Sequence, residues 1–118
     1  MLKLLVSLPI LKRLIPSLIK KFPLKEIDYE YNNIYFELDL RYLVDRRFFL
    51  YGYDTQNIQI LINQIQKYEI DYFIDIGSCW GLYSLQIANN HPNIRVFSFD
   101  AFKKNTDRLK TMSLKNNF

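Results

Sequence analysis

Hydrophobic and polar residues along the chain follow two periodicities, which indicate alternating strands and helices. Around Asn32-Asn33, residues 29–31 and 34–40 alternate in polarity and predict a β-hairpin, because asparagine tolerates the positive φ of a tight turn. The short runs 72–76 and 95–99 are apolar on both sides, which is typical of buried parallel strands. Apolar residues spaced three and four apart predict helices at 55–67, 82–89 and 103–116.

The first and last of these helices have recognisable ends and faces. The helix at 55–67 is capped by Asp54 or Thr55 and follows a short apolar piece, 48–51, that stops at Gly52. Its predicted inner face consists of Ile58, Leu61, Ile62 and Ile65. The last helix is capped near Asn105, and its predicted inward residues are Leu109, Met112 and Leu114. A strand–helix–strand–helix order favours an α/β fold.

Residues 1–22 have a different character and predict a basic amphipathic helix. Six apolar residues share one face of a helical wheel opposite Arg13, Lys20 and Lys21, whereas Val6, Ile10 and Leu14 lie on the polar side. Pro9 and Pro16 break or kink this helix. Charges interrupt every apolar run well short of the roughly 20 residues that cross a bilayer, which excludes a span. The helix either contacts a membrane surface weakly or packs on the rest of the domain or on a missing half. We divide the chain into the basic segment 1–23, a β-hairpin lead-in 24–53 and an α/β part 54–118.

Composition and charge limit the classes of function. The 118 residues allow one domain at most, and 49% hydrophobic content argues for a packed core. One Cys and one His exclude an internal disulfide and a zinc cluster, so we expect no metal and a cytoplasmic location. Residues 1–25 hold six basic and no acidic residues, a charge of +6, and the other ten basic and twelve acidic residues give −2. This mildly acidic remainder argues against nucleic acid as a partner.

The richest chemical signal is the loop that follows the first apolar strand. Asp75 lies near the strand end, Gly77 permits a tight turn without a Cβ, and Gly81 opens the next helix, which it allows to pack close to the strand. Nineteen residues after Gly81, the second strand ends in Asp100, whose carboxylate can accept hydrogen bonds from ribose hydroxyls. This order predicts the first half of a nucleotide-binding Rossmann unit.

The spacing of glycines in this loop discriminates between cofactors. Dinucleotide sites use Gly-x-Gly-x-x-Gly, whereas here Cys79 stands near the place of the middle glycine and Asp75 precedes the first. A carboxylate is unfavourable beside a pyrophosphate but favourable beside the amino group and sulfonium of S-adenosylmethionine. The loop therefore favours a methyl donor over a nicotinamide cofactor. Taken alone, Asp75 can also be a turn-forming residue, and Cys79 a small turn residue.

The run from Asp75 to Tyr83, followed by Val96-Phe-Ser-Phe-Asp100 and a helix closing on Asn116-Asn117, resembles the FkbM-type family of class I S-adenosylmethionine-dependent methyltransferases. The match covers roughly residues 45–118. It implies a partial Rossmann-like methyltransferase fold and a donor site formed by Asp75, Gly77, Ser78, Cys79, Gly81 and Asp100. The family's Ala-Asn is replaced here by Ser78-Cys79, and its Glu-Pro by Asp100-Ala101.

The resemblance implies S-adenosylmethionine-dependent methyl transfer to a hydroxyl of a sugar or small metabolite, with no catalytic base that the sequence identifies. It also implies that the chain is the N-terminal half of such an enzyme, so that Ile74, Ile76, Val96 and Phe99 lack packing partners and the chain self-associates. Two alternatives stay open. The chain is an inactive remnant or a fragment that needs a partner, or it is a small membrane-surface protein that uses its basic helix.

Overall fold

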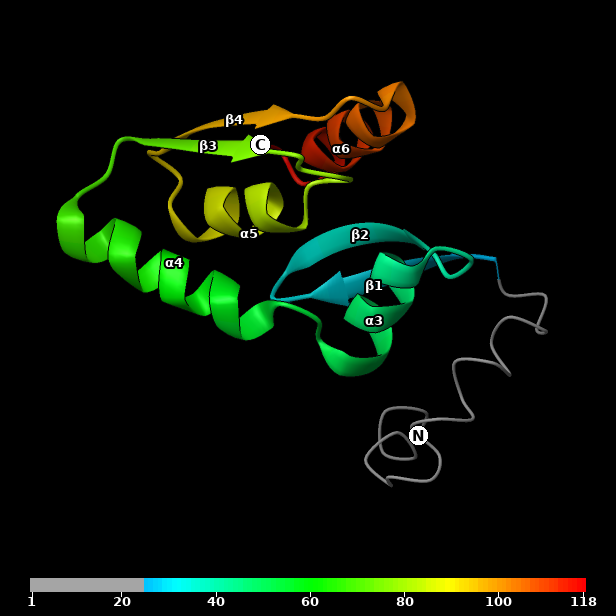
Figure 1. Cartoon of the computed structure of the whole chain (residues 1–118). Helices are drawn as coiled ribbons and strands as arrows, with labels where there is room; N and C mark the ends of the chain where they lie inside the picture. The colour runs from blue at the N-terminus through cyan, green and yellow to red at the C-terminus, as the bar shows by residue number, and fades with distance from the viewer. Residues whose placement is uncertain (1–24) are drawn as a thin grey trace. The chain divides into compact units, whose positions relative to one another are not determined.

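The structure is a computed structural model that describes residues 25–118 (Figure 1). The amphipathic helix predicted at 1–23 lies outside the described residues. The described elements are β1 (Glu26–Tyr31), β2 (Ile34–Asp39), α3 (Leu43–Tyr51), α4 (Thr55–Tyr68), β3 (Tyr72–Ile76), α5 (Leu82–Asn90), β4 (Arg95–Phe99) and α6 (Lys103–Lys115). The protein is therefore of mixed α/β class, as the sequence predicts.

The chain divides into two compact units, which we describe separately. Among the described residues, the first contains 25–29 and 36–54, and the second contains 30–35 and 55–118. The turn of the β1–β2 hairpin thus groups with the second unit. This turn confirms the prediction at Asn32-Asn33, since the two asparagines have φ values of 52° and 60°.

Helix α3 in the first unit corrects the prediction of a hairpin lead-in through residue 53. It begins after Tyr42, which supplies no side-chain cap, so the commonest sequence signal for a helix start is missing. Its buried charges satisfy the backbone of the preceding segment instead: Asp45 Oδ2 accepts the N–H of Asp39 at 2.7 Å, and Arg46 Nη1 donates to the carbonyls of Leu40 and Arg41 at 3.0 Å. The helix ends at Gly52, whose φ is 63°.

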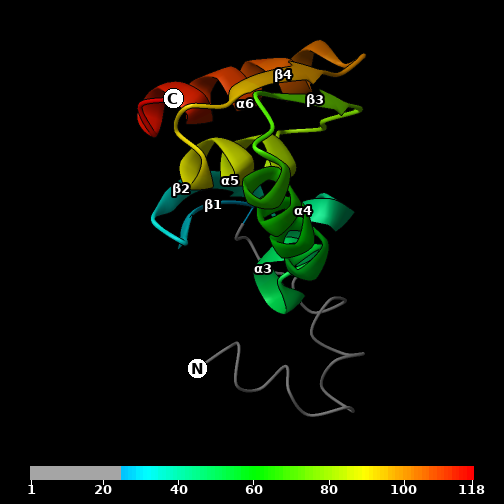
Figure 2. The ribbon, with the colours of Figure 1, turned by 90° about the vertical axis from the view of Figure 1, so that its left-hand side faces the viewer.

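The second unit is built on two parallel strands joined by a crossover helix. Strands β3 and β4 pair in register from Tyr72–Arg95 to Ile76–Phe99, and their bounds confirm the prediction. Figures 1 and 2 show α5 on one side of this sheet and no helix of the unit on the opposite side. Helix α4 buries Ile58, Ile62 and Ile65, and α6 buries Met112, in agreement with the predicted faces.

The burial of the two strands differs from the sequence prediction. Both strands were expected to be buried on both faces, but residues alternate between half-buried and exposed, because only the α5 side is covered. Val96 lies on the half-buried side, so its predicted lack of packing partners is wrong, whereas Ile74, Ile76 and Phe99 are exposed. Leu114 of α6, predicted to face inward, is 68% exposed.

Gly81 lies close to a side chain of α6. Its φ is 90°, and a Cβ added there would lie 2.2 Å from Cδ1 of Leu109 on α6. The glycine therefore allows Leu109 of α6 to approach the start of α5 closely.

Candidate functional site

The loop between β3 and α5 is held against the end of β4 by backbone hydrogen bonds. The N–H groups of Gly77 and Ser78 both donate to the carbonyl of Phe99, at 2.8 and 3.0 Å. The turn closes with the N–H of Gly81 on the carbonyl of Ser78 at 2.8 Å. Gly77 and Gly81 have positive φ values, and so does Cys79, with a φ of 51°. The loop is thus a fixed turn at the carboxyl ends of both parallel strands.

Asp100 connects this loop to the start of α6. Its Oδ2 accepts the N–H of Cys79 at 2.9 Å. Its Oδ1 accepts the N–H of Phe102 at 2.9 Å and the amide of Asn105 at 3.0 Å. A carboxylate offers about four lone-pair positions, and these three bonds leave room for one further donor. Asp100 therefore has a structural role in the described chain, whatever else it binds.

These hydrogen bonds also set the charge of Asp100. The Phe102 N–H, the Asn105 amide and the Cys79 N–H lower the pKa of the carboxyl group below its ordinary value, against a smaller opposing effect of burial. The group is consequently anionic at neutral pH. An anion at this position suits a ligand that presents hydroxyl or amino donors.

Asp75 belongs to a separate chain of polar side chains on the α5 side of the sheet. Ser84 Oγ lies 2.6 Å from Asp75 Oδ2 and 2.6 Å from Ser98 Oγ. Because the single hydroxyl proton of Ser84 goes to the carboxylate, Ser98 must donate to Ser84. Neither serine is predicted as a site residue from the sequence. The signal was the pairing of Asp75 with Ser98 across the two strands, which places them on the same face.

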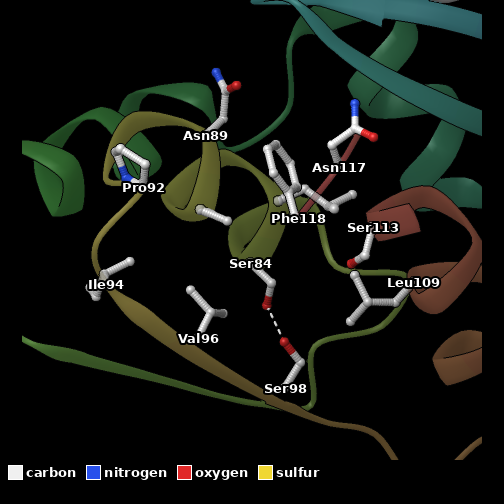
Figure 3. A pocket seen from close by; sticks show the side chains of 12 residues that line it. Ser84, Asn89, Pro92, Ile94, Val96, Ser98, Leu109, Ser113, Asn117 and Phe118 are labelled. Atoms are coloured by element: carbon white, nitrogen blue, oxygen red, sulfur yellow. Dashed lines mark hydrogen bonds between the residues drawn. The ribbon is translucent and has the colours of Figure 1, made fainter. Parts of the chain in front are cut away.

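A cavity of about 590 Å³ adjoins this polar chain, between α5, β4 and α6 (Figure 3). Ser84 and Ser98 lie on its wall, together with apolar side chains that include Val96 and Leu109. Gly77 and Asp100 do not line it, so this cavity is distinct from the loop at the carboxyl ends of the strands.

Two observations test whether the loop fits an adenosyl ligand. A Cβ built on Gly77 meets nothing within 4 Å, so the space beside this backbone is open. Ser78 Oγ is buried and makes no hydrogen bond among the described residues, which leaves a polar atom without a partner in the loop. Together with the anionic Asp100, these features are compatible with a polar ligand.

Trp80 and His91 make contacts within the fold. Trp80 is 1% exposed and packs under the guanidinium of Arg108, with 5.7 Å between the guanidinium carbon and the ring centre. His91 Nε2 lies 3.0 Å from the carbonyl of Ile62. In residues 25–118 no cluster of three or more His, Cys, Asp or Glu is arranged to hold a metal. Within the same range no helix has the length and hydrophobicity of a membrane span.

Comparison with known proteins gives one informative similarity. Over 46 residues the chain is 44% identical to a protein of Prochlorococcus marinus (strain MIT 9301) named ribosomal RNA small subunit methyltransferase G. The matching part is 39% of this chain and 19% of that protein, so it spans about a fifth of the relative's length. No family model and no solved structure matches the chain. The similarity supports a relationship to methyltransferases in general and does not distinguish the FkbM-type family.

Proposed function

We propose that the chain binds S-adenosylmethionine at the carboxyl ends of β3 and β4 and serves methyl transfer. The observation that carries the proposal is the hydrogen bond from the Cys79 N–H to Asp100, which joins the glycine turn to the acid of the neighbouring strand. In open α/β sheets, ligands bind outside the carboxyl ends of the strands. We also propose that the fold is a partial Rossmann-like methyltransferase fold of the FkbM type. The similarity to a methyltransferase supports methyl transfer as the class of reaction.

In this proposal the residues of the loop bind and orient the donor. Gly77 leaves room for the ligand beside the backbone, Ser78 offers an unpaired hydroxyl, and Asp100 accepts a hydrogen bond from the ribose. Cys79 and Gly81, both with positive φ, shape the turn, and Asp75 precedes it on β3, where it is hydrogen-bonded to Ser84. S-adenosylmethionine supplies a methyl carbon activated by a positively charged sulfur, and positioning provides most of the acceleration of its transfer.

The acceptor that we propose first is a hydroxyl of a sugar or small metabolite, with the FkbM-type resemblance as its support. A second candidate, RNA, is favoured by the distribution of charge in α6. This helix carries Lys103, Lys104, Arg108, Lys110 and Lys115 against the single acid Asp107, a net charge of +4. Basic helices of this kind bind phosphate backbones. The printed name of the relative, which refers to ribosomal RNA, points the same way.

Calorimetric titration of the full chain with S-adenosylmethionine tests donor binding. Asp100→Ala should weaken binding about tenfold or more, because it removes an anionic hydrogen-bond acceptor. Asp107→Ala is the matched control, since it removes an exposed acid that pairs with Lys103 on the outer side of α6. A folded chain that shows no heat of binding, or equal effects of the two variants, contradicts the proposal.

Transfer of a radiolabelled methyl group to RNA or to sugars separates the two acceptors. An RNA acceptor predicts that replacing Lys103, Lys104 and Lys110 by Glu abolishes labelling of RNA while donor binding persists. If the acceptor is a sugar, the same variant should label sugars as well as the wild-type chain does. If the chain binds the donor but methylates neither RNA nor sugars, the result supports the alternative that the chain is a fragment that needs a partner.

A further inference from the structure

One face of the β3–β4 sheet is apolar and uncovered in the part of the chain that the structure describes. Ile74 is 61% exposed, Ile76 84%, and Phe97 and Phe99 are 44% and 56% exposed. These four side chains form two adjacent rows, because Ile74 pairs with Phe97 and Ile76 with Phe99 across the strands. α5 lies on the other side of the sheet in both views (Figures 1 and 2). A contiguous patch of this kind typically marks an interaction site.

At the amino ends of the strands, Tyr72 and Arg95 extend the exposed face. Tyr72, 53% exposed, pairs with Arg95 and stacks on Phe97 with 6.3 Å between ring centres. The Arg95 guanidinium carbon lies 5.5 Å from the centre of the Tyr72 ring. The face thus has a β3 column of Tyr72, Ile74 and Ile76 beside a β4 column of Arg95, Phe97 and Phe99.

These two columns complement each other under a twofold rotation. The rotation axis runs parallel to the strands, above the face and midway between β3 and β4. A half-turn about this axis places β3 of one copy over β4 of the other and keeps every row in register. Each isoleucine then meets a phenylalanine ring, and each Arg95 meets the Tyr72 ring of the other copy, which is a favourable cation–π arrangement. Aligned sheets pack about 10 Å apart, a distance that side chains of this size fill.

We infer that this sheet face is the interface of a symmetric homodimer. Aromatic side chains bury about 150–250 Å² each, so five half-exposed apolar side chains contribute on the order of 500 Å² per copy. The total of about 1,000 Å² is near the lower bound of specific interfaces, and the dimer is accordingly a reversible one. Lipid is the poorer occupant, because Arg95 is the only basic residue on the face and membrane-surface elements are rich in Lys and Arg.

The proposed dimer brings the two loops at residues 77–81 to the same end of the assembly. Rotation about an axis parallel to the strands preserves strand direction, so both copies present the carboxyl ends of β3 and β4 at the same end of the dimer. The two loops and their Asp100 residues then lie at one end of the assembly.

Sedimentation velocity of the full chain over a wide range of concentrations tests the interface. The wild-type chain should show a monomer–dimer equilibrium, and Ile74→Lys should raise its dissociation constant about 100-fold or more, because it places a charge in an apolar interface. Ile60→Lys is the matched control, since Ile60 is 56% exposed on α4 and outside the face. Circular dichroism confirms that both variants fold.

Mixing two monomeric variants tests the predicted orientation. Ile74→Lys and Phe97→Glu should form a heterodimer when mixed, since the introduced charges oppose each other across the interface. Ile74→Lys mixed with Ile76→Glu should associate at least about tenfold more weakly, since those positions are in different rows. A wild-type chain that stays monomeric, assembly that continues past the dimer, an equal effect of Ile60→Lys, or no preference between the mixtures overturns the inference.

Discussion

Asp100 and the two loop glycines are the residues on which the geometry of the candidate site depends. Asp100 fixes the turn through Cys79 and the start of α6 through Phe102. Gly77 and Gly81 share a positive φ but differ in surroundings, because only the second is in close contact with a side chain of α6. Both the hydrogen bonds of Asp100 and the different surroundings of the two glycines have measurable effects on stability.

The first residue-scale prediction compares alanine at the two glycines. Gly77→Ala should destabilise the fold by about 1–2 kcal/mol, the cost of a Cβ at positive φ. Gly81→Ala should cost more, about 2–4 kcal/mol, because its Cβ also meets Leu109. Urea denaturation measures both. In a Leu109→Ala background the cost of Gly81→Ala should fall towards that of Gly77→Ala, and equal costs in the two backgrounds would show that the contact is unimportant.

The second residue-scale prediction concerns pH. A carboxyl group with a lowered pKa in the fold adds stability that is complete above its unfolded pKa and is lost as the pH falls through the folded value. The amide resonance of Cys79 should therefore shift with a midpoint below 3.8, the ordinary value for Asp100. NMR titration measures the midpoint. Asp100→Asn should abolish this transition and speed hydrogen exchange at Cys79, and a midpoint at or above 3.8 would argue against the bond.

At the scale of elements, the hydrogen bonds of Ser84 with Asp75 and Ser98 join α5 to both strands. Ser84→Ala removes the donor to Asp75 and the acceptor of Ser98, so it should destabilise the fold by about 1–3 kcal/mol. Ser98→Ala removes only the terminal donor and should cost about 0.5–1.5 kcal/mol. Chemical denaturation compares the two variants. If Ser98→Ala costs as much as Ser84→Ala, the direction of the hydrogen bonds is not the one described here.

At the scale of the whole molecule, charge is concentrated at the N-terminus. Residues 1–25 carry all of the net positive charge, which predicts weak binding of anionic lipid vesicles at low salt. Vesicle sedimentation of the full chain and of a chain that lacks residues 1–22 measures this binding. Equal pelleting of the two proteins would exclude the basic segment as a membrane contact.

The sequence by itself determined the local elements whose signals are local. Short apolar runs bounded by turn residues defined β3 and β4, and Asn32-Asn33 defined a turn, because these depend on preferences of a few neighbouring residues. The spacing of Asp75, Gly77, Gly81 and Asp100 likewise predicted a loop at two strand ends. Their roles in binding a donor stay predictions.

Tertiary structure decided what depends on partners distant in sequence. Helix α3 forms although Tyr42 gives no cap, because Asp45 and Arg46 bond to the backbone of residues 39–41. A Cβ at Gly81 would meet the side chain of Leu109, 28 positions away, and Asp100 accepts a hydrogen bond from Cys79 across 21 positions. The same holds for the sheet, because helix packing on one side covers alternate side chains of β3 and β4 and leaves those of the other side exposed.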